Sequence, residues 1–493
     1  MALLEAERAH LLGYLQSIEP RSIHELGDMW EFLRVSELML LDILQGRPEN
    51  PDYAGRGDPE VGHLLYHLNN PGAELLAMLE AEPFAKAAWR LIAHDLLPES
   101  RIGADFFQGL QATARSWPIV GSDGTLYGFG QYESLDPRWI EISLNMVITF
   151  AQGVHPFGSK PYRGELAANK DGKVRLGIVG DWGGGSGEND SSPAAAVMRQ
   201  LAAQGGDYLI HMGDVYYAGT GGAPHIPENQ EAVNFTSLWP RQYAAPGRSF
   251  TLNSNHEMYS GANGYFPLAL GGDIFRHQNM TSYFGLTFGQ WVILGLDSAY
   301  HAAAGSFYLQ GVLGEQQSAW IRQFGEDIGG FGGKKILVLT HHEGQDMQGR
   351  NLTPLHHEIT SAIGRAPDVW YWGHLHNGIV YGPASAAGRQ NVRARCVGHS
   401  AIPFGVAPGL LDASGNRIAG VEYFARTSSP AGGNRVLNGF ATLELDPNGG
   451  IAEAYYEQGN PAPVWSARSG RDAAPEDPGL TSAPAREPEP SPG

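Results

Sequence analysis

The sequence predicts an α/β layered domain over residues 171–460, preceded by a mainly helical region. Short apolar runs typical of buried strands alternate with helical patterns from residue 174 onward, as in α/β proteins. Hydrophobic residues make up 42% and charged residues 17% of the 493 residues, a balance typical of a core-forming chain. That length is enough for about two to four domains.

The N-terminal part of the chain is expected to be helical to about residue 110. Leu4, Leu11 and Leu15 recur at helical spacing, and Pro98 ends the last helical pattern. Residues 111–170 are predicted to be a connecting segment of mixed character. Residues 1–170 contain no motif that points to a chemistry, and the partner of this region is unknown.

The predicted catalytic segment follows a turn at Asp171. Ser191-Ser-Pro-Ala is a helix start with a hydroxyl N-cap and a proline in the first turn. We expect strands at 174–179, 208–212, 249–252, 282–286, 291–296, 336–340 and 369–372, and further helices at 314–324 and 353–363. Residues 461–493 contain eight of the 32 prolines and are predicted to be a disordered tail.

Charge and cysteine content exclude several classes of protein. Acidic residues outnumber basic residues 52 to 33, which argues against a protein that coats duplex nucleic acid or docks on anionic lipid. No apolar run is long enough to span a membrane, and the first residues do not resemble a secretory signal, so we expect a cytoplasmic protein. Cys396 is the single cysteine, so a metal site must use imidazole, carboxylate, amide or phenolate ligands.

Five motifs carry polar, ligand-type residues, and four of them follow a predicted strand. The carboxyl ends of strands line the ligand crevice in open α/β sheets, so these residues are expected to share one site. The motifs are Gly180-Asp181-Trp182-Gly183, Gly213-Asp214-Val215-Tyr216-Tyr217, Asn255-His256-Glu257, Thr340-His341-His342 and Gly373-His374-Leu375-His376.

Each motif alone has an ordinary structural explanation, such as a turn, a helix cap or a solvated surface pair. Their combination supplies what a two-metal hydrolase needs, a carboxylate that bridges both ions and separate ligands for each ion. Asp181 and Asp214 supply carboxylates, and Asn255 an amide oxygen. The imidazoles come from three histidines, His341, His374 and His376. This ligand set favours Fe, Mn or Zn over Ca or Mg.

The order of these motifs resembles that of the metallophosphoesterase superfamily, and within it that of the purple acid phosphatases. Most of the superfamily has a histidine ligand in the first motif, where this chain has Gly183. The second motif has a tyrosine, Tyr217, three positions after its aspartate, as in the purple acid phosphatases. The resemblance implies a four-layer sandwich of two mixed β-sheets flanked by helices, over about residues 174–400.

The resemblance also implies a ligand set. It assigns Fe(III) to Asp181, Tyr217 and His376, with Asp214 bridging to a second ion. That second ion, Fe, Zn or Mn, is assigned to Asp214, Asn255, His341 and His374. His256 is placed just outside the metal ligands, where it binds phosphate or protonates the leaving oxygen.

The chain departs from the family pattern at Ser254, where the family has glycine, and His342 is a rival to His341 as a ligand. The expected function is hydrolysis of a small phosphate monoester by metal-activated hydroxide. A phosphodiesterase acting on cyclic nucleotides or lipids is an alternative, because it uses the same metal motifs. A metal-bearing scaffold without turnover is a third possibility, of another class.

Overall fold

The computed structural model describes residues 153–186, 192–220, 229–304, 308–401, 410–412, 414–425 and 436–469. The predicted helical region 1–110 lies outside the described residues, and so do residues 111–152 of the connecting segment. Residues 470–493 of the predicted tail also lie outside them.

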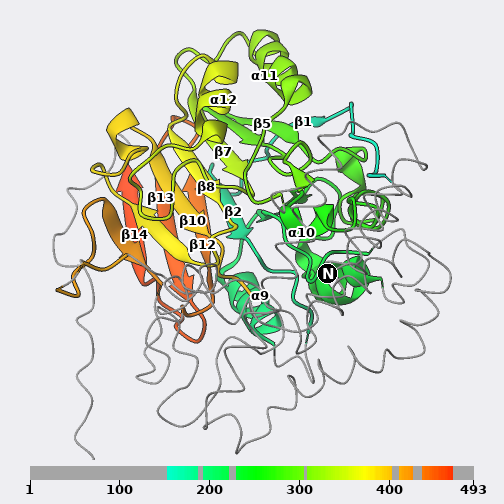
Figure 1. The fold of residues 1–493 in the computed structure, drawn as a ribbon, viewed down its shortest axis with the longest axis horizontal. Coiled ribbons are helices and arrows are strands. Elements are labelled where there is room, and N and C mark those ends of the chain that lie inside the picture. The colour runs from blue at the N-terminus through cyan, green and yellow to red at the C-terminus, as the bar shows by residue number, and fades with distance from the viewer. Residues whose placement is uncertain are drawn as a thin grey trace, which may run out of the picture.

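Two mixed β-sheets form the centre of the described structure (Figure 1). The eight-stranded sheet has the order β1-β5-β6-β7-β8-β10-β9-β11 and the six-stranded sheet the order β14-β13-β12-β2-β3-β4. The strands of the larger sheet are β1 (Tyr162–Glu165), β5 (Phe284–Phe288), β6 (Trp291–Gly295), β7 (Lys335–Thr340), β8 (Val369–Trp372), β9 (Gly378–Tyr381), β10 (Arg393–Val397) and β11 (Val421–Phe424). Those of the smaller sheet are β2 (Val174–Val179), β3 (Tyr208–His211), β4 (Ser249–Thr251), β12 (Gly439–Leu445), β13 (Ile451–Glu457) and β14 (Trp465–Ser469).

The main core lies between the two sheets. Ile178 and Leu443 from the smaller sheet belong to one buried cluster with Leu286 and Leu337 from the larger sheet. Alternate side chains of a strand point to opposite faces, so the strands of the larger sheet also present apolar residues to the outside. That second face is covered by helices and has its own buried cluster.

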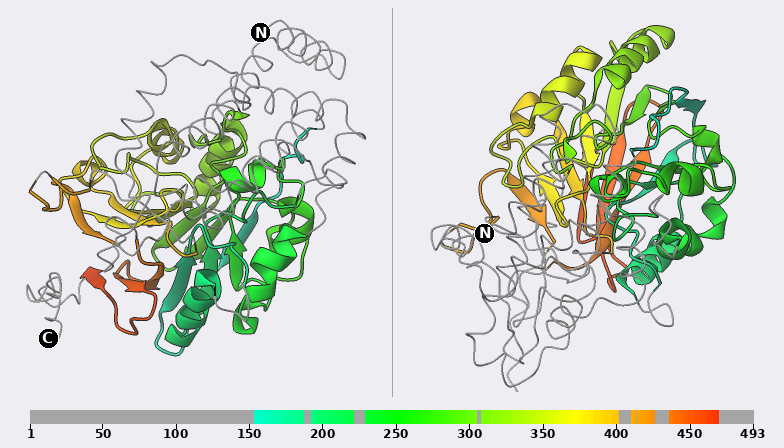
Figure 2. Two further views of the ribbon diagram at one scale, coloured as in Figure 1. Left: turned by 60° about the horizontal axis from the view of Figure 1, so that its bottom comes forward. Right: turned by 45° about the vertical axis from the view of Figure 1, so that its right-hand side comes forward.

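Helices cover the outer faces of both sheets. They are α9 (Pro193–Gln204), α11 (Glu315–Asp327) and α12 (Pro354–Ile363), and a short helix, α10 (Asn255–Met258), lies at the site. Helices α11 and α12 pack on the larger sheet, whereas α9 lies against the smaller one. Figure 1 shows α11 and α12 at the top and α9 at the bottom, and they stay apart in both views of Figure 2. The four-layer prediction is therefore confirmed.

A buried ionic cluster links the two sheets. Glu453 on β13 accepts hydrogen bonds from Arg395 Nε at 2.9 Å and Arg393 Nη1 at 2.9 Å, both on β10. Tyr371 on β8 donates to the same carboxylate at 2.7 Å. If one sheet shifted against the other, these partners would separate and leave a buried charge without a counter-ion. The cluster therefore favours one arrangement of the two sheets.

The predicted strands are found with bounds that differ by at most two residues at each end, and 174–179 and 369–372 are unchanged. The helix predicted at Ser191-Ser-Pro-Ala begins at Pro193, and the Ser192 side chain caps it by accepting from Ala195 N. The predicted limits of 171 and 460 are too narrow, because β1 and β14 extend the sheets on both sides. Among the described residues, none of the helices combines the length and apolar character needed to cross a bilayer.

Candidate metal centre

The topology brings the polar motifs to one place. Strands β2, β3 and β4 run parallel in the smaller sheet, and β7 and β8 run parallel in the larger one. Asp181 and Asp214 follow β2 and β3, while Asn255 begins α10 shortly after β4. His341 and His374 follow β7 and β8. The carboxyl ends of the two sets of strands therefore supply one site from both sheets.

One group of donor atoms gathers around His376 Nε2. Asp181 Oδ1 lies 3.3 Å from this nitrogen, and Asp214 Oδ2 lies 3.8 Å from it. The hydroxyl of Tyr216 lies 3.1 Å from the same nitrogen and donates to Asp214 Oδ2 at 2.6 Å. Asp181, Asp214 and Tyr216 are fully buried. We call these four side chains the first ligand group.

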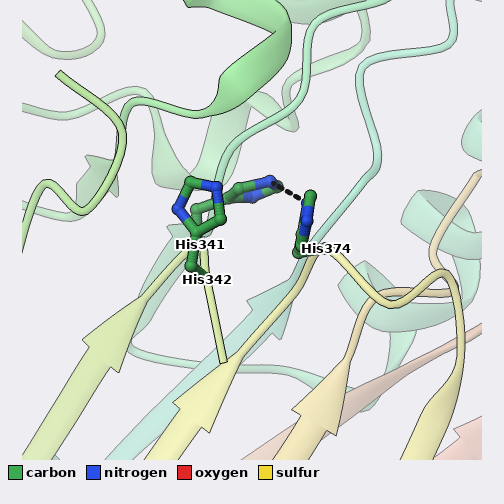
Figure 3. Close-up of side chains that lie close together, drawn as sticks. All are labelled: His341, His342 and His374. Atoms are coloured by element: carbon green, nitrogen blue, oxygen red, sulfur yellow. Dashed lines mark hydrogen bonds between the residues drawn. The ribbon is translucent and has the colours of Figure 1, made fainter. Parts of the chain in front are cut away.

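A second group gathers around His341 Nε2. Asn255 Oδ1 lies 2.7 Å from this nitrogen, His374 Nδ1 3.2 Å, and Asp214 Oδ1 3.4 Å. Figure 3 shows the imidazoles of His341 and His374 beside each other at the ends of neighbouring strands, with their contact dashed. Asp214 thus directs one oxygen to each group. These four side chains form the second ligand group.

The structure separates the two adjacent histidines of the fourth motif. His341 Nδ1 donates to the Met212 carbonyl at 2.9 Å, which leaves Nε2 directed at the other ligand atoms. His342 uses both ring nitrogens elsewhere: Nδ1 lies 2.9 Å from Ser298 Oγ, and Nε2 donates to the Tyr308 carbonyl at 2.7 Å. A histidine ligand needs one free nitrogen, so the geometry favours His341.

Four of the predicted ligands have left-handed backbone conformations. The φ angles are 54° at Asp181, 76° at Asp214, 63° at His374 and 45° at His376. Residues other than glycine rarely adopt this region, and the strain costs about 1–3 kcal/mol each. Such backbones are found where the fold aims a side chain at a functional site, and here they turn these side chains inward from the strand ends.

Glycines beside these ligands allow the loops to approach one another. A Cβ on Gly213 would lie 2.7 Å from Ser254 Cβ, and one on Gly373 would lie 2.4 Å from Asp181 Oδ2. A Cβ on Gly183 would lie 2.5 Å from the Asp214 carbonyl oxygen. There is accordingly no room at Gly183 for the histidine ligand that most of the superfamily has there.

His256 lies beside the first ligand group. Its Nδ1 donates to the Tyr217 carbonyl at 2.6 Å, and its Nε2 lies 3.7 Å from Asp214 Oδ2. Burial lowers the pKa of His256 to about 4, although the Asp214 carboxylate opposes the shift. His256, Asp214 and His376 are close enough together to hold a cation. The contact made by Tyr217 here comes from its main chain.

Ser254, which replaces the family's glycine, connects two carboxyl groups. Its Oγ lies 2.5 Å from Asp214 Oδ1 and also contacts Glu257 Oε2. Burial, together with the charge of Asp214, raises the pKa of Glu257 well above its ordinary value. A neutral Glu257 can donate to Ser254, which leaves the serine proton for Asp214.

The charges of the ligand groups depend on one another. Burial and the neighbouring Asp214 raise the pKa of Asp181 to about 6. Burial works to raise the pKa of Asp214 as well, but His256 and His341 outweigh it and hold this pKa well below its ordinary value. Burial works to lower the pKa of His376, but contacts with Asp181 and Asp214 raise it to about 9.

The donor sets fit two metal ions. Atoms bound to one ion at about 2.0–2.2 Å lie roughly 3–3.5 Å from each other, close to the spacings within each group. Asp181 Oδ1 is buried, and its polar contact in the first ligand group is His376 Nε2 at 3.3 Å, so it has a further lone pair to offer to a metal ion. The ligand atoms of Asp181, Asp214 and His341 are also close enough to one another to hold one cation.

Two residues next to the motifs, for which the sequence suggested pocket shaping or ordinary packing, contact the ligands. The hydroxyl of Tyr259 accepts from Asn255 Nδ2 at 2.8 Å, and so turns Asn255 Oδ1 toward His341. The hydroxyl of Tyr216 lies in the first ligand group and donates to Asp214 Oδ2. The spacing of Asn255 and Tyr259, one helical turn apart, is the signal that could have revealed the first of these contacts.

Comparisons with solved structures give distant likenesses. A purple acid phosphatase from yellow lupin (Lupinus luteus) seeds is 13% identical, with a TM-score of 0.41, over 61% of this chain. The match covers 54% of the lupin chain, so this chain spans about half its length. The anchor in the inner membrane complex of Plasmodium is 12% identical, with a TM-score of 0.39, over 60% of this chain and 88% of that one. A calcineurin-like phosphoesterase from Bacillus subtilis is 12% identical, with a TM-score of 0.26, over 60% and 90% of the two chains.

Comparison with protein families is more specific. None of the curated proteins matches the sequence. The family model described as calcineurin-like phosphoesterase matches residues 174–378, the segment that contains both ligand groups and His256. This segment of the chain is therefore similar to the calcineurin-like phosphoesterases.

Proposed function

We propose that the chain is a phosphoric ester hydrolase with two metal ions, of the purple acid phosphatase type, that acts on small phosphate monoesters. The observation that carries the proposal is the pair of ligand groups that share Asp214, one oxygen to each. The first group would hold Fe(III), and the second Fe, Zn or Mn. Imidazole and carboxylate ligands of this kind suit these metals.

Two ions bound there would neutralise the charge of a phosphate ester and lower the pKa of water for attack on phosphorus. The residues of the chain then hold the geometry. Asp214 fixes the distance between the two groups, and Tyr259 fixes the orientation of the Asn255 amide. By the order of the motifs, Tyr217 would complete the first group with its phenolate.

His256 is the proposed catalytic residue. Its Nδ1 is held by the Tyr217 carbonyl, so its Nε2 faces the ligand groups. From there it would contact the phosphate or, when its imidazole carries a proton on both nitrogens, give the Nε2 proton to the leaving oxygen. His256→Asn is therefore expected to lower turnover more than it lowers metal content.

A comparison of two substrates tests this function. The protein is loaded with iron and zinc, or with manganese, and the hydrolysis of para-nitrophenyl phosphate and bis-para-nitrophenyl phosphate is measured from pH 4 to pH 9. Faster turnover of the monoester supports the proposal, and Asp214→Asn serves as the inactive control. Faster turnover of the diester would favour the phosphodiesterase, and no turnover with two bound metals would favour the scaffold.

A further inference from the structure

A short segment that follows β10 lies against the first ligand group. It comprises residues Gly398 to Ala401 and belongs to none of the five motifs. His399 and Ser400 are fully buried, and Ala401 is 3% exposed. We call these four residues the β10 loop.

The β10 loop binds the main chain around Asp181. Ser400 N donates to the Gly180 carbonyl at 3.2 Å, and Gly180 N donates to Ser400 Oγ at 3.2 Å. Ala401 N donates to the Asp181 carbonyl at 3.1 Å. The Asp181 amide donates in turn to the Gly213 carbonyl at 3.1 Å, so the main chain of this ligand is held from both sides.

The same loop contacts the main chain beside His376. Gly398 N donates to the Asn377 carbonyl at 2.8 Å. A Cβ on Gly398 would lie 3.0 Å from His376 N and 3.1 Å from Asp181 Oδ2. The φ angle of Gly398 is not left-handed, so this glycine is needed for the close approach and not for its backbone conformation.

We propose that the β10 loop positions the first ligand group, with Ser400 as its main positioning residue. The inference rests on the metal centre of the proposed function. Asp181 and His376 have left-handed backbones, with φ angles of 54° and 45°. Such a backbone persists only where its surroundings hold it. The β10 loop supports both of these ligands at once, and so helps to set the 3.3 Å between Asp181 Oδ1 and His376 Nε2.

The loop also joins the two sheets at the site. It follows a strand of the larger sheet, and the His399 carbonyl accepts from Gly439 N at 3.0 Å and from Asn438 Nδ2 at 3.1 Å. Gly439 begins β12 of the smaller sheet, which pairs with β2. Ser400→Ala removes the hydroxyl to which the buried Gly180 N donates, directly before the first ligand.

Metal titration of matched serine variants tests the inference. Metal-depleted wild type, Ser400→Ala and Ser249→Ala are titrated with zinc, and their folding is checked by circular dichroism. Asp181→Asn and Asn255→Ala identify binding at the first and the second group, because each changes a ligand of one group only. Ser249 is the matched control, since it is fully buried and its Oγ donates to the Tyr243 carbonyl at 2.6 Å, away from both groups.

We expect Ser400→Ala to weaken zinc binding at the first group at least tenfold, the effect typical of partners behind metal ligands. Binding at the second group should change less than threefold, and Ser249→Ala should change neither. Gly398→Ala, whose methyl group would press on Asp181 and His376, should weaken the first group to a similar degree. An unchanged first group in either loop variant, or equal losses at both groups in Ser400→Ala, would overturn the inference.

Hydrogen exchange of the wild type decides the question if the loop variants do not fold. Coupling between two sites is reciprocal, so a loop that supports the bound ligands is itself stabilised by the bound ion. Amides of residues 398–401 should exchange at least tenfold more slowly with zinc than without it, while α11 stays unchanged. Equal exchange in the two states would contradict a positioning role.

These measurements separate the inference from the proposed function, because neither uses a phosphate ester. Zinc affinities that respond to Ser400→Ala as expected, in a protein that hydrolyses no ester, refute only the function. Zinc affinities that ignore the loop variants, in a protein that hydrolyses esters, refute only the positioning role. Wild type that binds no metal refutes both.

Discussion

The contact between Asn255 and Tyr259 makes a quantitative prediction about the second metal ion. The Asn255 amide is buried, with its Nδ2 bound to the Tyr259 hydroxyl and its Oδ1 directed at His341. Burial raises the pKa of Tyr259, so its hydroxyl stays neutral and can accept this hydrogen bond. Tyr259→Phe removes the acceptor and leaves a buried N–H group without a partner.

The size of the effect follows from that lost partner. A buried donor left unsatisfied costs about 1–3 kcal/mol, and outer-shell partners of metal ligands contribute about 10- to 100-fold in affinity. The amide can relieve the cost by rotating, but Nδ2 then faces the ion in place of Oδ1. We expect the affinity for the second ion to fall about 10- to 100-fold, while the first ion binds as in wild type.

Isothermal titration of the metal-depleted protein with zinc or manganese measures both affinities. Tyr283→Phe is the matched control, because Tyr283 is also buried and its hydroxyl accepts from Gln316, outside both ligand groups. The control is expected to lower the melting temperature without changing either affinity. Unchanged affinity for the second ion in Tyr259→Phe would show that this hydroxyl does not orient Asn255.

The remaining predictions concern the bridging ligand, the rival histidine and the ionic cluster. Asp214→Asn should lower the content of both metals in elemental analysis, and a loss of one metal alone would contradict bridging. His342→Gln should keep both metals yet lower the unfolding midpoint, and metal loss would make it a ligand. Glu453→Gln should cost about 3–5 kcal/mol in urea unfolding at neutral pH, because it leaves Arg395 buried and unpaired. Burial works to raise the pKa of Glu453, but Arg395 outweighs it and holds the pKa below the ordinary value of 4.5. The gap between wild type and variant should therefore be full above about pH 4.5, then shrink as the pH falls through the folded pKa. Glu444→Gln is the control: Glu444 lies in a partly exposed ion pair, so this variant should lower the free energy of unfolding by only about 0–1 kcal/mol. If the difference between wild type and Glu453→Gln does not change with pH, the ionised Glu453 is not what stabilises the cluster.

Much of the fold was predictable because buried strands appear in the sequence as short runs of apolar residues. The runs at 174–179 and 369–372 are continuously apolar apart from Arg175, and they have the predicted bounds. The predicted strands end at 372 and did not include β1 or β9 to β14; of these, β1 and β14 lie at the edges of their sheets and have mixed exposure. Their pairing with β5 and β13 depends on tertiary contacts that no local pattern records.

The candidate site was likewise predictable from the sequence only in part. The sequence by itself determined which residue types could bind metal, because one cysteine excludes thiolate clusters and the motifs carry carboxylate, amide and imidazole. It also determined their order, which resembles that of the metallophosphoesterase superfamily. Tertiary structure decided which nitrogen of which neighbour is directed at the other ligand atoms, for His341 against His342. The physical reason is that orientation depends on left-handed backbones at the ligands and on partners such as Met212 and Ser298, which lie far away in the sequence.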